Sequence, residues 1–368
     1  MKIALSIEAL STNLTGIGRY TLELSRRLAS DPAIADLTFY RNGNWSRDTS
    51  RFLVNDPIEK SRIGTPQWLR NRQNVWRLRD RVFHGPNYFL PDFVNNGIVT
   101  VHDLSVIHFP ETHPADRVRH FEREFNSSLK RSAHIITDCQ TVRHELLKYT
   151  GFPLDRITAV PLGVSPNFGR VPPKSLIDVL KRYDLSAGTY SLCVSTIEPR
   201  KKIRELLKSW QELPNAIKRQ FSLVVIGGNG WLSDDIKLDM GKCIDAGWLR
   251  YLGYVPELDL PSLYQGAALF AYPSAYEGFG LPPIEAMASG VPTIVSNRSC
   301  LSEVTQGAAM VVDPDDTRDY ANALERGLTD HAWRVQAINH GLAVAARYTW
   351  ERCAEETKEV YRHVLSNC

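Results

Sequence analysis

The sequence has few cysteines, little net charge and no long apolar run, and each shortage excludes a class of protein. The six cysteines are scattered and form no C-x-x-C pair, so they offer no zinc-binding spacing. No stretch approaches the roughly 18 apolar residues that a membrane-spanning helix requires. A formal net charge of +3 over 368 residues is too small to predict nucleic-acid binding.

The amino terminus, MKIALSIEALS, lacks the apolar region and the cleavage site of a secretory signal peptide. Scattered cysteines also fit a reducing compartment, so we expect a cytoplasmic protein. Hydrophobic residues make up 43% of the chain and charged residues 23%, as in an ordinary globular protein. Because single cores stop growing at about 250 to 300 residues, the length predicts two domains.

Short β-branched runs alternate with amphipathic stretches, a pattern typical of α/β domains with parallel, doubly wound sheets. Candidate strands of the first half lie at residues 2–7, 37–40, 82–84, 97–101, 134–137 and 157–160. Those of the second half lie at residues 191–195, 221–228, 249–254, 268–272, 293–296 and 309–312. The sequence therefore predicts two similar Rossmann-like halves.

Residues 161–173, PLGVSPNFGRVPP, contain four prolines and two glycines, which is typical of an interdomain linker. We therefore expect one domain over residues 1–169 and a second over 170–348. The last stretch, 349–368, predicts a helix that is capped by Thr349 and crosses back to the first domain. Its apolar face carries Trp350, Cys353, Val360, Tyr361 and Val364.

The segment YPSAYEGFGLPPIEAMASGVP, residues 272–292, combines a glycine-rich turn with a short helix. Two prolines open the helix and Gly290 closes it. Backbone N–H groups at such a helix start are unpaired and carry partial positive charge, so they suit a diphosphate. We assign this role to the backbone of Gly278, Phe279, Gly280 and Leu281.

Charged side chains lie beside this helix start and in a second segment. Glu277 lies on the loop and Glu285 about one turn inside the helix, so both can face one hydroxyl-rich ligand. An E-x7-E pair also occurs by chance, and a solvated Glu285 is the alternative. The segment STIEPRKK, residues 195–202, follows a strand and places Arg200 and Lys201 where they can neutralise a leaving diphosphate. A solvated surface is the alternative there.

Three segments of the first half follow strands, at the sheet edge where doubly wound folds bind ligands. TGIGRYTLEL contributes two glycines that permit close approach of a phosphate to the backbone. VTVHDLS contributes a histidine and an aspartate, for which packed structural roles are the alternative. FHGPNYFLP contributes a histidine and an asparagine. The candidate ligand-contacting residues are Gly16, Gly18, His102, Asp103, His84 and Asn87.

Two other ligand classes have little support. A dinucleotide fingerprint would need a glycine at Thr21 and an acidic residue ending the second strand, where the chain has Tyr40 and Arg41. A dehydrogenase is therefore disfavoured. The run Asp313-Pro314-Asp315 is formally D-x-D, but its proline is typical of an ordinary turn, so we assign no metal.

The P-S-x-x-E-G-F-G context resembles the sugar-nucleotide signature of retaining glycosyltransferase family 4, which has the GT-B fold, over most of the chain. The resemblance implies an acceptor-binding first domain and a nucleotide-sugar-binding second domain. It implies that Glu285 holds the ribose, Glu277 the donor hexose and Lys201 the diphosphate, with His102 by the donor sugar. Many members have an arginine where this chain has Ser195, and Arg200 is the candidate replacement.

The segments HDLSVIHFPE, FHGPNYFLP and TIEPRK are similar to those of bacterial mannosyl- and rhamnosyltransferases that use GDP-sugars to build O-antigen. This resemblance implies retaining transfer of a hexose, first of all mannose from GDP-mannose or else a GDP-rhamnose, to a lipid-linked saccharide. It implies neither a metal nor another cofactor, and it implies acceptor contacts from His84, Asn87 and Asp103. The alternatives are a nucleotide-sugar epimerase and a non-catalytic sugar-nucleotide-binding component of a polysaccharide-assembly complex.

The stretch from Lys60 to Arg81 holds seven basic residues interleaved with apolar ones, among them Trp68 and Trp76, and a single acidic residue, Asp80. Basic residues near anionic lipid contribute about 1 kcal/mol each, and tryptophan favours the membrane interface. The stretch therefore predicts peripheral contact with the inner face of the cytoplasmic membrane. A solvated helix with core-facing tryptophans is the alternative.

Overall fold

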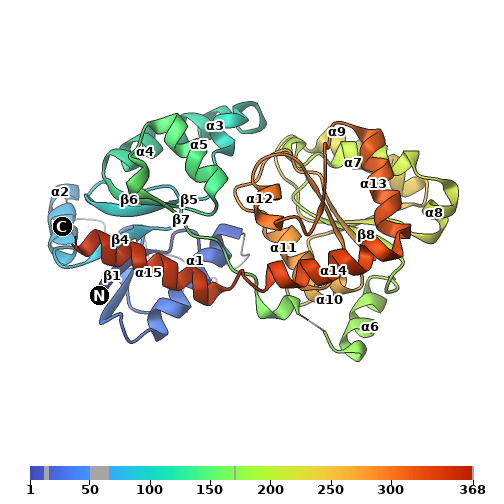
Figure 1. Cartoon of the computed structure of the whole chain (residues 1–368). Helices are drawn as coiled ribbons and strands as arrows, with labels where there is room; N and C mark the ends of the chain where they lie inside the picture. Colours follow the sequence, from blue (N-terminus) through green and yellow to red (C-terminus); the bar gives the residue numbers. More distant parts are fainter. Residues whose placement is uncertain (12–15, 50–65, 170, 367–368) are drawn as a thin grey trace. The chain divides into compact units, whose positions relative to one another are not determined.

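A computed structural model describes residues 1–11, 16–49, 66–169 and 171–366 of the chain (Figure 1). The chain divides into two compact units, each built on one sheet. The first unit comprises Met1–Leu104, Asp116–Gly163 and Trp350–Cys368, and the second comprises Ser105–Ala115 and Val164–Thr349. The predicted class, α/β with two Rossmann-like doubly wound sheets, is confirmed.

The sheet of the first unit has seven strands in the order β3-β2-β1-β4-β5-β6-β7, parallel except for the β2–β3 pair. The strands are β1 (Lys2–Ser6), β2 (Asp36–Arg41), β3 (Asn44–Ser46), β4 (Val82–Gly85), β5 (Gly97–Val101), β6 (Ser132–Thr137) and β7 (Ile157–Ala159). The helices are α1 (Gly16–Ser30), α2 (Gln67–Arg77), α4 (Ala115–Lys130), α5 (Gln140–Thr150) and α15 (Trp350–Ser366). Figure 1 shows α4 and α5 on one side of the sheet and α1 and α15 on the other, as right-handed crossovers require when the strand order reverses at β1.

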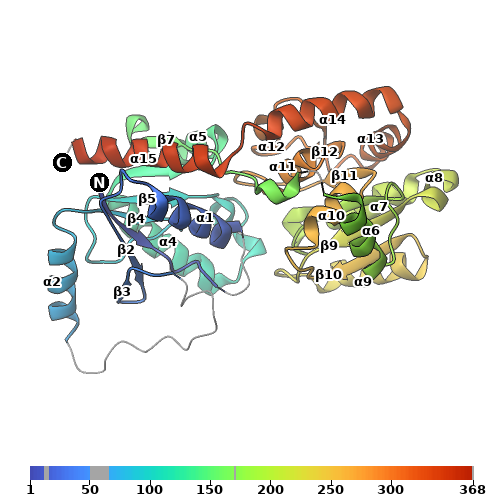
Figure 2. The same cartoon turned by 90° about the horizontal axis from the view of Figure 1, so that it is seen from below.

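The short strand β3 differs from the sequence-based expectation, which ended the second strand at its apolar run. Asn42 and Gly43 both have positive φ, 47° and 85°, and join β2 to β3 in a two-residue hairpin. An Asn-Gly pair is the residue choice that such turns prefer, because both positions need left-handed backbone. The hairpin lies beside α2 in Figure 2, and Trp45 Nε1 donates to Asn74 Oδ1 at 2.9 Å.

The sheet of the second unit has six parallel strands in the order β10-β9-β8-β11-β12-β13. The strands are β8 (Tyr190–Val194), β9 (Ser222–Ile226), β10 (Leu249–Gly253), β11 (Leu269–Tyr272), β12 (Thr293–Ser296) and β13 (Met310–Val312). The helices are α3 (Ser105–His108), α6 (Pro173–Arg182), α7 (Ile203–Glu212), α8 (Asn215–Gln220), α9 (Asp234–Asp245), α10 (Leu260–Gln265), α11 (Leu281–Ala288), α12 (Leu301–Thr305), α13 (Thr317–Thr329) and α14 (His331–Ala345).

Both faces of this second sheet are buried, which explains the nearly continuous apolar runs of its strands. Leu269 and Ala271 of β11 pack in a core with α7, α9 and α13, which includes the fully buried Trp210. Phe270 and Tyr272 point to the opposite face, where α6, α10, α11 and α12 cover them. Successive side chains of one strand thus pack into the two cores on opposite faces of the sheet. The carboxyl ends of the strands continue into polar loops.

Helix α15 is the predicted amphipathic helix, and all five residues of its expected apolar face are buried. It packs against α1, β4 and β6 of the first unit. Two ion pairs add to the apolar contact: Arg27 Nη2 lies 2.7 Å from Glu351 Oε1, and Lys358 pairs with Asp31. In the described part of the chain, no helix is both long enough and apolar enough to cross a bilayer.

Candidate functional site

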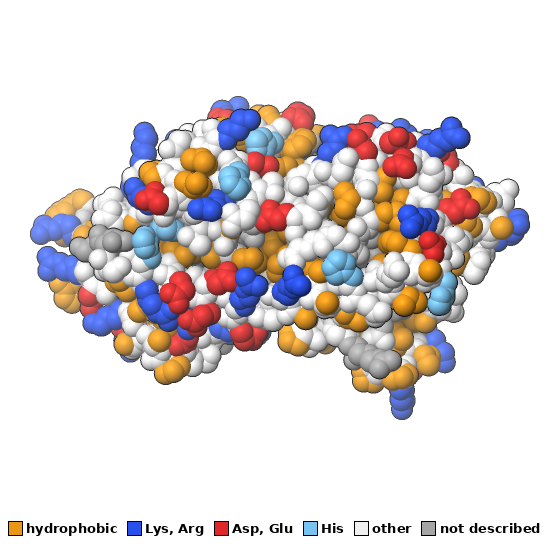
Figure 3. Space-filling view, in the orientation of Figure 1, with side chains coloured by type: hydrophobic (Ala, Val, Ile, Leu, Met, Phe, Trp, Pro, Cys, Tyr) orange, Lys and Arg blue, Asp and Glu red, His pale blue; other side chains and the backbone are white. Residues whose placement is uncertain are grey.

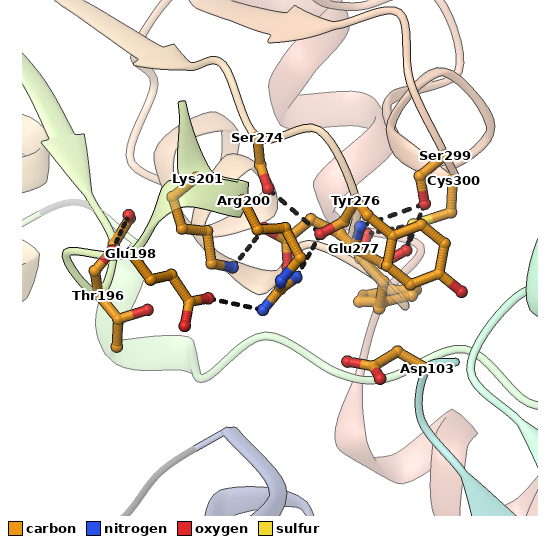
Figure 4. Close-up of polar contacts among 12 residues, drawn as sticks. Asp103, Thr196, Glu198, Arg200, Lys201, Ser274, Tyr276, Glu277, Ser299 and Cys300 are labelled. Carbon is orange, nitrogen blue, oxygen red and sulfur yellow. Dashed lines mark hydrogen bonds and ion pairs between the residues drawn. The ribbon is translucent and has the colours of Figure 1, made fainter. Parts of the chain in front are cut away.

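Polar loops meet at the carboxyl edge of the second sheet (Figure 4). They follow β8, β11 and β12, which are neighbours in the strand order, so residues that are about 75 to 100 positions apart in sequence come together. The loop after β8 ends in a short 3-10 turn, Pro199–Lys201, before α7 begins. The loop after β11 leads directly into α11.

A group of three side chains, two of them buried and Glu277 partly so, forms the centre of this site. Lys201 Nζ lies 2.5 Å from Glu277 Oε1, and the Tyr272 hydroxyl donates to the same oxygen at 2.8 Å. Lys201 Nζ also donates to the Tyr272 hydroxyl oxygen at 3.3 Å. The Lys201 side chain is 9% exposed and that of Glu277 12%, so the pair is largely shielded but still accessible to solvent.

Arg200 adds a second cation to this group. Its Nη2 donates to Glu198 Oε1 at 2.7 Å, its Nη1 lies 4.0 Å from Glu277 Oε2, and Nη1 also donates to the Tyr276 carbonyl oxygen. Burial by itself raises the pKa of Glu277, but the charges of Lys201 and Arg200 outweigh it, so the net pKa is lowered. Glu277 is therefore ionised at neutral pH.

The glycine-rich turn after Glu277 is held by the loop that follows β12. The Ser299 hydroxyl donates to the Glu277 carbonyl oxygen and accepts from the Glu277 N–H at 3.2 Å. Cys300 Sγ lies 3.1 Å from that carbonyl oxygen and 3.3 Å from the Phe279 one. Gly280 has a φ of 92°, and a Cβ there would lie 2.7 Å from a Leu301 methyl, so the turn into α11 requires glycine.

Glu285 is the fifth residue of α11, about one turn inside the helix as expected, and is buried. Its Oε2 accepts from the Tyr264 hydroxyl at 3.0 Å. Burial, reinforced by the Glu285 charge, raises the pKa of Tyr264, so this hydroxyl stays protonated and donates. A solvated Glu285, the alternative reading of the sequence, is therefore wrong.

Two glycines of the run Gly227-Gly228-Asn229-Gly230, which sequence reasoning passed over, allow the loops after β8 and β9 to touch. Gly227 has a φ of 146°, and a Cβ there would lie 1.9 Å from the Ser195 carbonyl oxygen. A Cβ on Gly230 would lie 2.9 Å from the Ile197 carbonyl oxygen. The signal was available, because a glycine cluster directly after a strand marks close backbone approach.

In the first unit, His102 follows β5 and is buried. Its Nδ1 lies 2.8 Å from Asp138 Oδ2 and its Nε2 lies 2.9 Å from the Pro86 carbonyl oxygen. A carbonyl oxygen only accepts, so Nε2 carries a proton, and a second proton on Nδ1 matches the Asp138 carboxylate. Burial lowers the pKa of His102, but Asp138, the Pro86 carbonyl and Asp103 together raise it by more, so the net pKa is raised.

Sequence reasoning offered Asp103 as the neighbour of His102 and missed Asp138. The ladder pairs Val101 of β5 with Thr137 of β6, so the residues that follow the two strands lie side by side. Asp103 is half-buried, and its own N–H donates to the Tyr88 hydroxyl at 3.1 Å. A polar residue directly after the neighbouring strand was the signal for Asp138.

His84 is completely buried on β4. Its Nδ1 lies 2.7 Å from the Tyr361 hydroxyl of α15, and its Nε2 lies 2.8 Å from Thr100 Oγ1. Burial lowers its pKa to about 3, so the ring is neutral and joins α15 to the sheet. This arrangement favours a structural role for His84 over the predicted acceptor contact. Asn87, the other residue predicted from this segment, is half-buried, and its acceptor contact stays a prediction.

The remaining candidates lie at two helix starts and one turn. Gly16 and Gly18 open α1, and a Cβ on Gly16 would meet nothing within 4 Å, so open space adjoins the backbone there. The D-x-D carboxylates are bound by cations: Arg298 Nη2 lies 2.9 Å from Asp313 Oδ1 and 3.1 Å from Asp315 Oδ2. Asp313 Oδ1 also accepts from the Asp315 N–H at 3.0 Å, as in an ordinary turn.

The basic stretch of residues 60–81 is described from residue 66 onward, so Lys60 and Arg62 lie outside the described residues. Most of the rest forms α2. Trp68 is 59% exposed and Trp76 is 68% exposed. The alternative of core-facing tryptophans is therefore wrong.

Comparison with known proteins bears on the whole chain. The family described as glycosyl transferases group 1 matches residues 185–343. O-antigen chain mannosyltransferase B of Escherichia coli is 37% identical over 384 residues, spanning 98% of this chain and 100% of that protein.

Solved structures with the same fold cover nearly the whole chain at low sequence identity. HepE of Anabaena, in complex with UDP and glucose, superposes with a TM-score of 0.74 at 14% identity over 99% of this chain and 100% of that one. WaaG, a glycosyltransferase involved in lipopolysaccharide biosynthesis, superposes with a TM-score of 0.73 at 13% identity over 97% and 99%.

Proposed function

Because this chain belongs to the group 1 glycosyltransferase family and has the GT-B fold, we propose that it transfers mannose from GDP-mannose to a saccharide during O-antigen assembly. The observation that carries the proposal is the buried Lys201–Glu277 pair at the start of α11. The mannosyl group and the pathway are supported by the full-length similarity to the Escherichia coli O-antigen chain mannosyltransferase B.

The second unit is proposed to hold the donor. Lys201 and Arg200 would neutralise the diphosphate, and the backbone of residues 278–281 would donate to it at the start of α11. Glu277 is ionised and accepts only, so it would receive hydrogen bonds from hexose hydroxyls. Glu285, oriented by Tyr264, would bind the ribose hydroxyls.

Retention without a covalent intermediate is the proposed stereochemical course. Glu277 Oε1 already accepts from Lys201 and Tyr272, which lowers its nucleophilicity. The bond from the anomeric carbon to the phosphate oxygen would break while the acceptor oxygen attacks the same face. The acceptor proton would pass to the departing phosphate, whose charge Lys201 stabilises. Two cations at the diphosphate support transfer without a metal.

His102 is proposed to act as a fixed, protonated group. In this structure both ring nitrogens face acceptors, Asp138 and the Pro86 carbonyl, so neither has a lone pair available as a general base. Its positive charge and its orientation are the properties that catalysis would use. Gly16 and Gly18 at the start of α1 would complete the donor contacts from the first unit.

The acceptor is proposed to be lipid-linked, because α2 exposes apolar and basic side chains together on one face, as a helix that contacts a membrane does. Trp68, Arg72, Val75 and Trp76 follow helical spacing on one face, and all four are exposed. At the left edge of Figure 3, where Figure 1 draws α2, hydrophobic side chains adjoin basic ones. An anionic membrane surface suits such a face, because tryptophan enters the interface while arginine stays at the headgroups.

The experiment that tests the function is a donor panel with a mannose-terminated acceptor: GDP-mannose, GDP-rhamnose, UDP-glucose and ADP-glucose, each with EDTA. We expect transfer from GDP-mannose to a product whose new glycosidic linkage has the same anomeric configuration as the donor, as measured by NMR. Glu277→Gln should abolish transfer, whereas Glu257→Gln, an exposed glutamate of the same unit, should not. Interconversion of the donor without an acceptor would instead identify an epimerase, and tight GDP-mannose binding without turnover would identify a binding component.

A further inference from the structure

An open cavity of about 800 Å³ lies wholly within the first unit, separate from the polar group of the second. Its walls are the loops after β1 and β4, the β2–β3 hairpin, α2 and α4. Cavities of about 300 to 1,000 Å³ are the usual size of small-molecule sites. The proposed donor contacts do not use this cavity, so it is available for another ligand.

Two features beyond the plain Rossmann core make the cavity. The hairpin brings Trp45 opposite α2, where Asn74 fixes the indole N–H and the Arg77 guanidinium lies 5.8 Å from the ring centroid. The residues of α2 that line the cavity are all polar, whereas its two tryptophans and Val75 are exposed to solvent. Without the hairpin and α2, the edge beyond β2 would be open.

The lining chemistry is rich in amides and nearly balanced in charge. Five side-chain amides line the cavity: Asn42, Asn44, Asn71, Gln73 and Asn74. Three carboxylates, Glu8, Asp92 and Glu124, are matched by two guanidiniums, Arg70 and Arg77. Amides both donate and accept, which suits hydroxyl groups, and the charge balance disfavours a strongly anionic ligand such as a phosphate.

An aromatic cluster gives the cavity a rigid base. Tyr40 contacts Trp45 and Phe93 edge to face, with ring centroids 5.1 and 5.3 Å apart. Trp45 is half-buried, so part of the indole remains accessible. Fixed aromatic surfaces beside hydrogen-bonding side chains suit a ligand that has apolar C–H faces and hydroxyl edges.

Glu8 follows β1 in the cavity wall. Its side chain is exposed to solvent at the cavity wall, and the neighbouring protein atoms raise the pKa of its carboxyl group by desolvation. An ionised carboxylate accepts hydrogen bonds from hydroxyl groups. Glu8 is therefore a suitable partner for hydroxyls.

We propose that this cavity binds the sugar residues of the acceptor that precede the terminal residue to which the new mannose is added. The cavity would thereby select acceptors by length. The inference rests on the proposed function. The ligand class is an uncharged saccharide of more than one ring, recognised by the amides, Glu8, Glu124 and the Trp45 surface. The same α2 that presents its exposed face to a membrane forms one wall, which suits a saccharide carried on a lipid.

The test uses the full chain with two variants on α4. Glu124 lines the cavity, whereas Glu122 is exposed and does not, so Glu124→Gln and Glu122→Gln form a matched pair. A Gln73→Ala, Glu124→Gln double variant removes two cavity contacts. Acceptor KM is measured with mannose oligosaccharides of one to four residues, and GDP-mannose KM is measured at a saturating concentration of acceptor.

We expect the double variant to raise acceptor KM about fivefold to tenfold for the longer oligosaccharides and to leave it unchanged for the monosaccharide. Donor KM should stay the same, and Glu122→Gln should match the wild type. Equal KM changes at every length, or none, would overturn the inference. If the wild type does not transfer mannose, saturation-transfer NMR with the same oligosaccharides still decides it: contact in the wild type that is lost in the double variant supports a saccharide site, and no contact refutes it.

Discussion

The carboxyl edges of the two sheets differ in how they are built. In the second unit, Lys201, Arg200 and Glu277 are already paired with one another and shielded from solvent. In the first unit, the corresponding edge opens into a cavity whose walls come from a hairpin and an exposed helix. A compact group of paired charges suits one invariant chemical step, whereas a wide amide-lined cavity suits a ligand of several similar units.

The largest expected effect comes from the paired group. Lys201→Ala should lower kcat by about 10²- to 10³-fold, because it removes the cation that we propose stabilises the leaving diphosphate and leaves Glu277 without its ion-pair partner. Steady-state kinetics with GDP-mannose measure the loss, and circular dichroism checks folding. A folded variant with kcat within threefold of the wild type would contradict the proposal that the paired charges of the second unit carry the chemical step.

Glu285 sharpens the contrast within the second unit. Glu285→Ala should raise the KM for GDP-mannose about tenfold or more with a smaller change in kcat, because ribose contacts are equal in the ground and transition states. Tyr264→Phe, which removes the hydroxyl that orients Glu285, should change KM in the same direction by less. Titration calorimetry measures the dissociation constant of GDP directly. A loss confined to kcat would contradict the ribose assignment.

Helix α2 is the next test, and it concerns the first unit alone. Replacing Trp68 and Trp76 with alanine should weaken binding to anionic vesicles by roughly tenfold or more, because it removes the two exposed indoles that we propose enter the membrane interface. Co-sedimentation with vesicles containing phosphatidylglycerol measures it, and neutral vesicles are the control. Transfer to a water-soluble acceptor should be unchanged. Equal binding of both proteins would exclude the membrane role of α2.

The smallest expected effect is a pH dependence of stability. The pKa of His102 is raised above its ordinary 6.5 in the folded state, so its pairing with Asp138 stabilises the fold fully below that value. The contribution is lost as pH rises through the raised pKa. Asp138→Asn should remove the contribution of this pair to the free energy of unfolding. The difference in free energy of unfolding between wild type and variant should therefore become smaller as pH rises above 6.5. Urea unfolding across that range measures it, and a constant gap would refute the assignment.

Much of the fold could be predicted from local pattern. Apolar runs such as those of β9 and β11 were recognised because strands buried on both faces lack polar interruptions. The Gly-rich turn before α11 was recognised because proline and glycine have specific backbone requirements there. The β2–β3 hairpin was missed, although Asn42-Gly43 signals it, because the short strand β3 has no periodicity of its own.

The candidate site divides along the same line. Glu277, Lys201 and Arg200 lie in short segments whose composition is unusual, so the sequence was sufficient to single them out. Tyr272 and Tyr264 belong to apolar runs and look like core residues until the fold places their hydroxyls beside Glu277 and Glu285. Asp138 became the partner of His102 only through the register of β5 and β6.

By itself, then, the sequence determined two α/β sheets, the turn and helix at Glu277 and Glu285, and the cations of residues 200–201. These depend on backbone preferences and charge within a few consecutive residues. Tertiary structure alone decided that Tyr272 joins Lys201 and Glu277, that His84 is buried against α15, and that a hairpin and α2 enclose a cavity. Such contacts join residues up to 277 positions apart, and no local pattern encodes which distant side chain fills a given space.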